Sequence, residues 1–310
     1  MEIVLQVLLL VLGFVMLMKG ADWFVDGAAG IADKFGIPQL VIGLTIVAMG
    51  TSAPEAAVSI TAALRGNAAI TIGNVVGSNI MNILIILGIA SVIVSIAVAK
   101  STVKYEIPFM LVITVLLTVL GSTGGYITRM EGVILWIAFI LYLTYLFFMA
   151  KNSKEETEEE GEKKPVWHFL LLLIIGVLLV VKGSDFTVEA ATNIAKAAGL
   201  SDRLIGLTIV AFGTSLPELV TSTSAALKGK ADIAIGNIVG SNVFNILFVV
   251  GTTALITPVL FEAKFLIDSI IAIGAGVLLW LFVFKDRKLK RAGGIVMLIS
   301  YAGYFAYLMI

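Results

Sequence analysis

The sequence contains no cysteine and only one histidine, His168. Disulfide bonds, thiolate metal sites, thiol catalysis and histidine-rich metal centres are therefore excluded. Charge is also scarce, because only 14% of the 310 residues are Asp, Glu, Lys or Arg, against about 25% in soluble domains. Hydrophobic residues make up 59% of the chain, so most of its surface has to contact lipid. The formal net charge of zero gives no reason to expect a nucleic-acid partner.

Ten apolar stretches are long enough to cross a bilayer as helices, which takes about 20 residues. We predict an all-α membrane protein with helices at about 3–31, 38–64, 68–98, 105–123, 130–150, 166–194, 202–227, 231–258, 263–284 and 292–309. The N-terminus lacks a basic region and a small-residue cleavage site, so we do not interpret it as a removable signal peptide. Residues 151–165 are rich in Glu and Lys and are predicted to be a solvated linker between the halves 1–150 and 166–310.

Lysine and arginine are distributed unevenly among the connections between these helices. Connections after odd-numbered helices carry fourteen: Lys34, Lys100, Lys104, Lys151, Lys154, Lys163, Lys164, Lys228, Lys230, Lys285, Arg287, Lys288, Lys290 and Arg291. Connections after even-numbered helices carry five: Arg65, Arg129, Lys196, Arg203 and Lys264. Cytoplasmic loops are enriched in positive residues. We therefore predict a multi-pass plasma-membrane protein with a cytoplasmic linker and both termini outside.

The two halves repeat one another at a shift of 163 residues. Residues 43–55 read GLTIVAMGTSAPE and residues 206–218 read GLTIVAFGTSLPE, while IGNVVGSNIMNIL at 72–84 matches IGNIVGSNVFNIL at 235–247. Five spans per half is an odd number, so the second half should enter the membrane in the opposite orientation. In transporters built from inverted repeats, the substrate site lies near the midplane on interrupted helices.

Each copy of the repeat places one glutamate, Glu55 or Glu218, inside an apolar segment. A carboxylate at membrane depth is costly and usually marks an ion pathway or a proton relay. The matched segments contain no basic residue that could neutralise it. The counter-charge is therefore expected to be a mobile cation, and the alternative is a protonated glutamate in a packing role.

Proline and hydroxyl residues precede each glutamate. Pro54 and Pro217 are predicted to interrupt helix interiors, because proline lacks a hydrogen-bond donor and clashes with the carbonyl four residues back. Carbonyls freed at membrane depth, near Ala48 and Ala211, have to face protein or a water-lined cavity. A bound cation would satisfy these oxygens.

The second repeated motif supplies neutral oxygens. Ser78 and Asn82 are four residues apart and share a helix face, and Ser241 and Asn245 repeat that face. Interhelical packing is a serious rival role for such residues. Two asparagines on another face are predicted to pack: Asn79 and Asn242. An all-oxygen site suits a hard cation of the size of Ca²⁺ or Na⁺ rather than copper, zinc or iron.

Charged residues recur on the first helix of each half. They are Lys19, Asp22 and Asp26, and their counterparts Lys182, Asp185 and Glu189. A spacing of three or four residues puts each set on one helix face. Anchoring at the membrane interface, with the lysine extended towards water, is favoured over a role at the mouth of the ion path.

The duplicated GTS-x-PE and GN-x-x-GSN-x-x-N segments closely resemble the two alpha repeats of the sodium/calcium exchangers, within the cation/calcium exchanger superfamily. The resemblance covers the membrane core of both halves. It implies ten helices in two inverted five-helix halves, with interrupted helices 2, 3, 7 and 8 around the ion site. It also implies electrogenic, alternating-access exchange of three Na⁺ for one Ca²⁺. The short linker has no room for regulatory calcium-binding domains, so the chain resembles a minimal prokaryotic form of the family.

The resemblance also implies roles for single residues. Glu55 and Glu218 would bind Ca²⁺ directly, together with the carbonyls of Thr51 and Thr214. The sodium ligands would be the carbonyls of Ala48 and Ala211 with Thr51, Ser52, Thr214, Ser215, Ser78 and Ser241. Asn82 and Asn245 would occupy the middle of the site, and an amide at position 245 argues against potassium co-transport. The first helix of each half is expected to slide against the rest.

Three alternatives compete with sodium/calcium exchange. Proton/calcium exchange is the closest, but a proton needs only the carboxylates and the duplicated hydroxyl and amide oxygens favour sodium. An intramembrane serine protease would use Ser52 or Ser215 with His168, yet the serine is duplicated and the histidine is not. A passive channel stays open as an alternative. We expect a monomeric transporter rather than an enzyme, without a cofactor, whose substrates are Ca²⁺ and Na⁺.

The predicted topology can be tested with a tag at the C-terminus. Because ten spans and a cytoplasmic linker place both termini outside, an antibody should reach the tag in intact cells. A tag that becomes accessible only after the membrane is permeabilised would reverse the predicted orientation.

Overall fold

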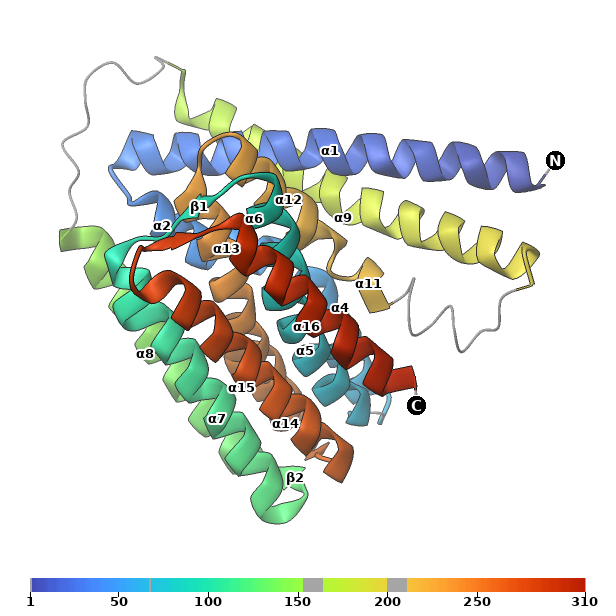
Figure 1. The fold of residues 1–310 in the computed structure, drawn as a ribbon, viewed down its shortest axis with the longest axis vertical. Helices are drawn as coiled ribbons and strands as arrows, with labels where there is room; N and C mark the ends of the chain where they lie inside the picture. Colours follow the sequence, from blue (N-terminus) through green and yellow to red (C-terminus); the bar gives the residue numbers. More distant parts are fainter. Residues whose placement is uncertain (1, 67, 153–163, 200–210, 310) are drawn as a thin grey trace.

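The structure of the chain is a computed structural model that describes residues 2–66, 68–152, 164–199 and 211–309. Two predicted segments lie partly outside the described residues: most of the linker, at 153–163, and the beginning of the seventh predicted helix, at 202–210. The described residues are almost entirely helical (Figure 1).

The first half contains five helical segments. They are α1 (Glu2–Phe35); α2 (Gln39–Ile42), η1 (Gly43–Val47), α3 (Ala48–Thr51) and α4 (Ala53–Leu64); α5 (Ala69–Met81), η2 (Asn82–Leu87) and α6 (Gly88–Ile93); η3 (Thr102–Glu106) and α7 (Ile107–Gly124); and α8 (Arg129–Asn152). The symbol η denotes a π-helical turn. Two short strands are β1 (Ile96–Ala97) and β2 (Tyr126–Ile127).

The second half follows the same order where it is described. Its helices are α9 (Val166–Ala197); α11 (Ala211–Gly213) and α12 (Leu216–Leu227); α13 (Ala231–Phe244), η5 (Asn245–Val250) and α14 (Gly251–Ile256); α15 (Ala263–Phe284); and α16 (Arg291–Met309). Its strands are β3 (Val259–Leu260) and β4 (Lys288–Leu289).

The chain has the helices of a membrane protein. Among the described residues, seven helices are long and apolar enough to cross a membrane, and the bent segment from α2 to α4 makes an eighth if it counts as one span. Where they are described, the helical segments begin and end within about five residues of the predicted spans, and the largest difference is at the end of α6, Ile93 instead of residue 98. Neither α16 nor the described part of the seventh predicted span meets the same test, so a total of ten spans stays a prediction.

The second predicted helix is interrupted, although not in the way its proline suggested. We expected Pro54 to disturb a helix interior. Instead, α3 ends at Thr51 and α4 begins at Ala53, with a bend of 49° between the two segments. Pro54 lies in the first turn of α4, where the backbone N–H that proline lacks would have no acceptor within the helix. Pro217 occupies the same place in α12, so each proline begins a helix rather than bending one.

The centre of the molecule is formed by α13 with its extension through η5 and α14. In the most apolar 18-residue stretch of this segment, 94% is buried inside the molecule. The corresponding share is 72% in the related segment from α5 to α6 and 17–39% in the other unbroken spans. We expected these two central helices to be interrupted. They continue without a break and contain instead a π-helical turn, which begins at Asn82 in one and at Asn245 in the other.

Contacts between the halves come in reciprocal pairs. Strand β1 pairs with β4, and β2 pairs with β3. In the repeat, β3 is the counterpart of β1 and β4 is the counterpart of β2. Exchanging the two halves therefore converts the β1–β4 pair into the β3–β2 pair. A two-fold relation between the halves produces such reciprocity.

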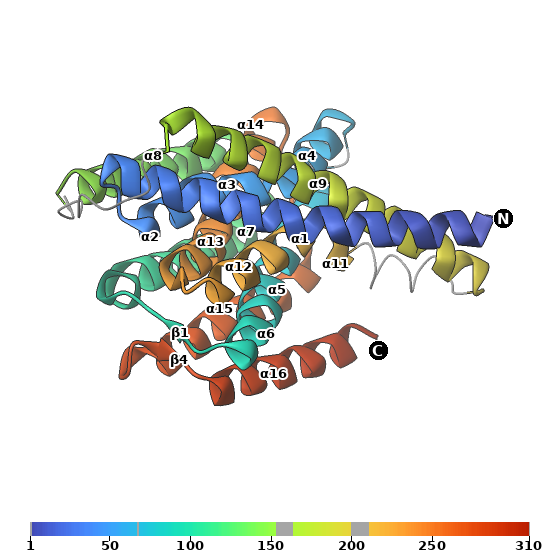
Figure 2. The ribbon, with the colours of Figure 1, turned by 90° about the horizontal axis from the view of Figure 1, so that it is seen from above.

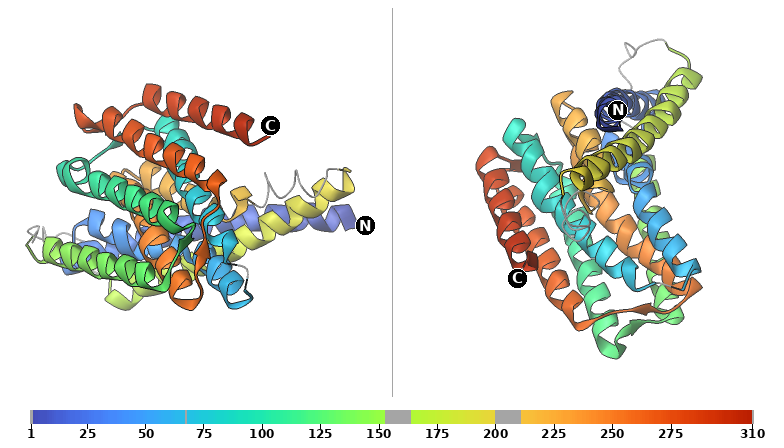
Figure 3. Two further views of the ribbon diagram at one scale, coloured as in Figure 1. Left: turned by 90° about the horizontal axis from the view of Figure 1, so that it is seen from below. Right: turned by 90° about the vertical axis from the view of Figure 1, so that its right-hand side faces the viewer.

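Helices α1 and α9 form the closest reciprocal contact. They run side by side, crosswise to most of the other long helices, and extend beyond them (Figures 1 and 2). A β-carbon built on Gly20 would lie 2.9 Å from the carbonyl oxygen of Gly176, and one on Gly13 would lie 2.9 Å from that of Gly183. Only glycine permits the two backbones to approach so closely. Helix α16 lies on the opposite side of the molecule, with α5, α12 and α13 between (Figures 2 and 3).

Candidate ion-binding site

Glu55 and Glu218 are buried in the interior of the molecule. Each carboxylate side chain belongs to the first turn of a helix, α4 or α12, and each residue is only 1% exposed. The N-terminal end of a helix carries a positive partial charge, which stabilises a nearby carboxylate. The two helix breaks therefore bring negative groups into the core and offset part of their charge.

Each carboxylate is bonded by hydroxyl groups from the opposite half. The Ser52 hydroxyl donates to Oε1 of Glu218 at 2.8 Å, and the Thr51 hydroxyl also lies within reach of that carboxylate. The Thr214 hydroxyl is placed in the same way against Glu55. Ser78 of α5 adds a longer contact of 3.4 Å to Oε1 of Glu55. The two breaks therefore meet, and the site is built across the two halves.

The carbonyl of Ala48 lies at the centre of several of these groups. It accepts a bond from the Ser52 amide at 3.0 Å and longer contacts from the hydroxyls of Thr51 and Ser241, at 3.3 and 3.4 Å. In the second half, Ala211 begins α11, and Thr214 lies half-buried between α11 and α12. Ser215 is buried at the start of α12.

Four asparagines connect α5 and α13. Asn79 donates to the carbonyl of Asn242 at 3.2 Å, and Asn242 donates to the carbonyl of Asn79 at 3.3 Å. Asn82 donates to Oδ1 of Asn242 at 2.9 Å, and Asn245 donates to Oδ1 of Asn79 at 3.1 Å. Asn79 and Asn242 therefore do pack the helices together, as expected. They also hold the amides of Asn82 and Asn245 in a fixed orientation.

Four acceptor oxygens at this place have no hydrogen-bond donor among the described residues. They are Oε2 of Glu55, Oε2 of Glu218, Oδ1 of Asn82 and Oδ1 of Asn245. All four are buried, and they form two pairs related by the repeat. A buried acceptor without a partner is costly, and none of the ion pairs in the described parts of the chain brings a lysine or arginine to either glutamate. Bound cations are partners that would satisfy such oxygens.

The site includes residues that the sequence interpretation did not single out. Asn74 donates to the Ser59 hydroxyl at 2.9 Å and to the carbonyl of Glu55 at 3.2 Å. Asn237 donates to the Ser222 hydroxyl at 2.9 Å and accepts a bond from Thr51 at 3.0 Å. Both asparagines lie inside the duplicated IGN sequence, so their repetition was the available signal. They position the helices that carry the glutamates.

The serine protease alternative finds no support in this geometry. His168 lies near the beginning of α9, against the rings of Trp167 and Phe169. Ser52 is bonded to a carboxylate, and the Ser215 hydroxyl has no hydrogen-bond partner within the described residues. Among the described residues, no hydrogen bond joins either serine to His168, the base that this alternative requires.

Helix α1 is fastened to the C-terminal end of α12. Lys228 donates to Oδ1 of Asp26 at 2.8 Å and to the carbonyl of Asp22 at 2.9 Å. The Ser224 hydroxyl donates to Oδ1 of Asp22 at 2.7 Å. We call these contacts the α1 clamp. The acidic residues of α1 thus bind a specific partner helix, which interface anchoring alone does not require.

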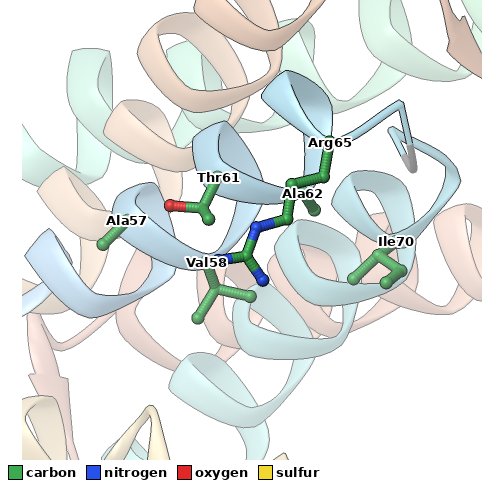
Figure 4. A pocket seen from close by; sticks show the side chains of 6 residues that line it. All are labelled: Ala57, Val58, Thr61, Ala62, Arg65 and Ile70. Carbon is green, nitrogen blue, oxygen red and sulfur yellow. The ribbon is translucent and has the colours of Figure 1, made fainter.

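The related end of the first half has no such clamp in the described residues. The counterparts of Ser224 and Lys228 are Thr61 and Arg65 of α4, and Asp185 is bonded instead to Lys182 of its own helix at 3.2 Å. Thr61 and Arg65 line a hollow of about 670 Å³ together with Ala57, Val58, Ala62 and Ile70 (Figure 4). None of the twelve predicted ligands lines this hollow. The two ends of the molecule therefore differ although their sequences are related.

Known proteins are similar to this chain over most of its length. The family model described as sodium/calcium exchanger protein matches residues 5–148 and 168–310. The putative antiporter CaxA of Alkalimonas amylolytica is 41% identical over 303 residues, which cover 94% of this chain and 95% of that protein. The sodium/calcium exchanger MaX1 of Methanosarcina acetivorans is 33% identical in an alignment of 350 positions, gaps included, that covers 99% of both chains.

A solved structure extends the similarity to the fold. The structure of the sodium-calcium exchanger NCX_Mj matches with a TM-score of 0.87 and 36% sequence identity, and the match covers 99% of each chain. The family model, the full-length relatives and the solved structure all match both halves of the molecule. This chain therefore belongs to the sodium/calcium exchanger protein family.

Proposed function

We propose that this chain is an antiporter that exchanges Na⁺ for Ca²⁺ across the membrane by alternating access. The observation that carries the proposal is the set of four unpartnered acceptor oxygens, from Glu55, Glu218, Asn82 and Asn245. Two carboxylates balance the charge of one Ca²⁺ or of two Na⁺. The printed names of the relatives, a sodium/calcium exchanger and a putative antiporter, support the same assignment.

Ca²⁺ takes six to eight oxygen ligands in a flexible geometry. We assign it to the carboxylates of Glu55 and Glu218 with the carbonyls of Thr51 and Thr214. We assign Na⁺ to the carbonyls of Ala48 and Ala211 and to Thr51, Ser52, Thr214, Ser215, Ser78 and Ser241. Asn82 and Asn245 complete the middle of the site. Exchange of three Na⁺ for one Ca²⁺ would move one net charge per cycle.

The architecture that we propose is a pair of inverted five-helix repeats, residues 1–150 and 166–310, joined by a cytoplasmic linker at 151–165. The reciprocal strand pairing and the reciprocal glycine contacts of α1 and α9 support a two-fold relation. With an odd number of spans per half, the second half would have the opposite orientation in the membrane from the first, so the two-fold axis would lie in the membrane plane. The predicted surroundings are a plasma membrane, with the chain acting as a monomer.

The α1 clamp offers a physical basis for alternating access. It holds α1 against α12 at the end of the molecule that the charge bias assigns to the cytoplasm. At the other end, Arg65 lines a hollow and the described residues contain no equivalent clamp. The arrangement fits a state closed towards the cytoplasm, from which α1 and α9 would move together to close the outer end.

Proton/calcium exchange remains the second candidate. Buried carboxylates can carry protons as readily as they bind metal ions, and the printed name of the putative antiporter CaxA does not specify a counter-ion. The hydroxyl and amide groups around the carboxylates favour Na⁺, because proton transfer would not need them. The two functions differ in the gradient that drives transport.

Reconstituted vesicles separate these two candidates. We expect an outward Na⁺ gradient to drive Ca²⁺ uptake, and a pH gradient alone to drive none. The measurement is ⁴⁵Ca²⁺ uptake at clamped membrane potential, with choline in place of Na⁺ as the control. Uptake that follows the pH gradient and ignores Na⁺ would establish the proton alternative instead.

The carboxylates can be tested one at a time. Glu55→Gln or Glu218→Gln leaves a single negative charge against a divalent ion, so Ca²⁺ affinity should fall by about 100-fold or more, which corresponds to about 2.7 kcal/mol. The measurement is calorimetric or radioligand binding to purified protein. Glu262→Gln, at an exposed ion pair with Lys264, is the matched control and should bind normally. Near-normal Ca²⁺ binding by either core variant would refute the assigned site.

The α1 clamp can be tested with an introduced thiol, because the chain has no native cysteine. Ala225 is a buried residue of α12, and we expect Ala225→Cys to react faster with a water-soluble maleimide when Lys228→Gln is also present. Partly exposed ion pairs contribute little, so the expected increase is about two- to fivefold. Lys230→Gln is the control. Equal labelling rates in all three proteins would exclude a role of the clamp in closing this end.

A further inference from the structure

A second hollow, of about 400 Å³, lies at the end of the molecule where β1 pairs with β4. Its lining comes from the residues before and within η3 and from the C-terminal end of α15: Lys100, Val103, Lys104, Trp280, Phe284, Lys285 and Arg287. Four of the seven lining residues are positively charged and none is negatively charged. Such a concentration of positive charge attracts an anionic ligand.

The carboxylates near this hollow do not neutralise it. Asp286 is bonded to Lys290, and this bond holds the pKa of Asp286 below its usual value, with a smaller contribution from Lys285. Among the described residues, no ion pair involves Lys100, Lys104, Lys285 or Arg287. The hollow therefore keeps its positive charge.

Arg287 adopts a backbone conformation that an arginine rarely takes. Its φ is +47°, and no other described residue except glycine has a positive φ. The turn at the same place in the first half carries Gly125, with a φ of +70°, so the repeat shift here is 162 residues instead of 163. The two turns make equivalent bonds, from the Val98 amide to the carbonyl of Arg287 at 2.9 Å and from the Phe261 amide to that of Gly125 at 2.8 Å.

The fold therefore requires the turn but not the arginine. A side chain in the left-handed region costs energy that glycine does not incur. Arg287 has this strained conformation at a position where the first half has a glycine. The side chain of Arg287 lines the basic hollow. Backbone strain of this kind occurs at ligand-binding sites, so we interpret Arg287 as a residue retained for its side chain.

An aromatic wall completes the hollow. Nε1 of Trp280 donates to the carbonyl of Val103 at 2.9 Å, which fixes the indole ring, and Phe284 packs edge-on against it at 5.0 Å. Below this wall, Val277, Leu281 and Phe284 lie on one face of α15, and they are 38%, 60% and 60% exposed. A strip of exposed apolar side chains thus leads away from the four positive charges.

The related place in the second half does not repeat this charge. The counterparts of Lys100 and Lys104 are Ala263 and Ile267. Lys264, which lies nearby, is paired with Glu262 at 2.9 Å. The basic hollow is therefore a property of one end of the molecule, the end that the distribution of lysine and arginine assigns to the cytoplasm.

We propose that this hollow binds the phosphate group of an anionic phospholipid, whose acyl chain lies along the apolar face of α15. Basic pockets between membrane helices on the cytoplasmic side are suited to such head groups, and tryptophan is enriched at the membrane interface. A free phosphate ion would use the positive charges but not the apolar strip. The proposal is independent of which ion the protein transports.

The test is native mass spectrometry of the full-length protein in mixed micelles of phosphatidylcholine and phosphatidylglycerol. The wild-type chain should retain one phosphatidylglycerol in preference to phosphatidylcholine. Arg287→Gly should reduce this preference at least fivefold, and it should fold normally because it introduces the residue that the related turn already uses. Lys264→Gln removes a positive charge at the other end and should retain the lipid.

Two further measurements keep the outcome unambiguous. A double variant, Lys100→Gln with Lys104→Gln, should also lose the lipid, while its thermal unfolding stays that of the wild type. Millimolar inorganic phosphate should not displace phosphatidylglycerol. Displacement by phosphate would show a plain anion site, and retention of lipid by Arg287→Gly and the double variant, or its loss in Lys264→Gln, would overturn the proposal.

Discussion

Two carboxylates buried without a basic partner are the constraint on which the rest of this structure depends. A negative charge at membrane depth has to be compensated, and the fold offers helix N-termini, hydroxyl groups and fixed amides rather than lysine or arginine. A permanent cation from the protein would occupy the place of the substrate. Acceptor oxygens on Glu55, Glu218, Asn82 and Asn245 have no donor among the described residues, and in the function that we propose a mobile ion binds there.

This constraint also explains why the halves interlock. Ser52, in the break of the first half, bonds the glutamate of the second, and the asparagines of α5 and α13 bond across the interface in both directions. Neither half contains a complete site. The groups of the proposed ion site therefore come from both halves. The close glycine contacts join α1 to α9, and in the proposed alternating-access cycle these two helices would shift together against the core.

The helices, the two breaks and the buried pair of glutamates could be predicted from the sequence, because the repeat at 163 residues identifies the segments that both halves share. It was wrong about the role of Pro54, since a motif does not reveal whether a proline ends one helix or begins the next. Asn74 and Asn237 were missed because an amide can pack or position equally well. The sequence could not single out Arg287, because its importance follows from its positive φ. That angle becomes informative only when it is compared with Gly125, which occupies the equivalent turn.

A molecule with two related halves needs some difference between its ends if the two sides of the membrane are to be distinguished. The asparagine contacts and the strand pairing do not supply this difference, because they are reciprocal. The differences lie at the periphery. Lys228 clamps α1 whereas Arg65 lines a hollow, and Arg287 occupies a turn that elsewhere takes glycine. In the functions that we propose, peripheral residues favour one conformation or bind a lipid of one leaflet and leave the proposed ion ligands unchanged. Symmetry at the site is therefore compatible with asymmetry at the ends.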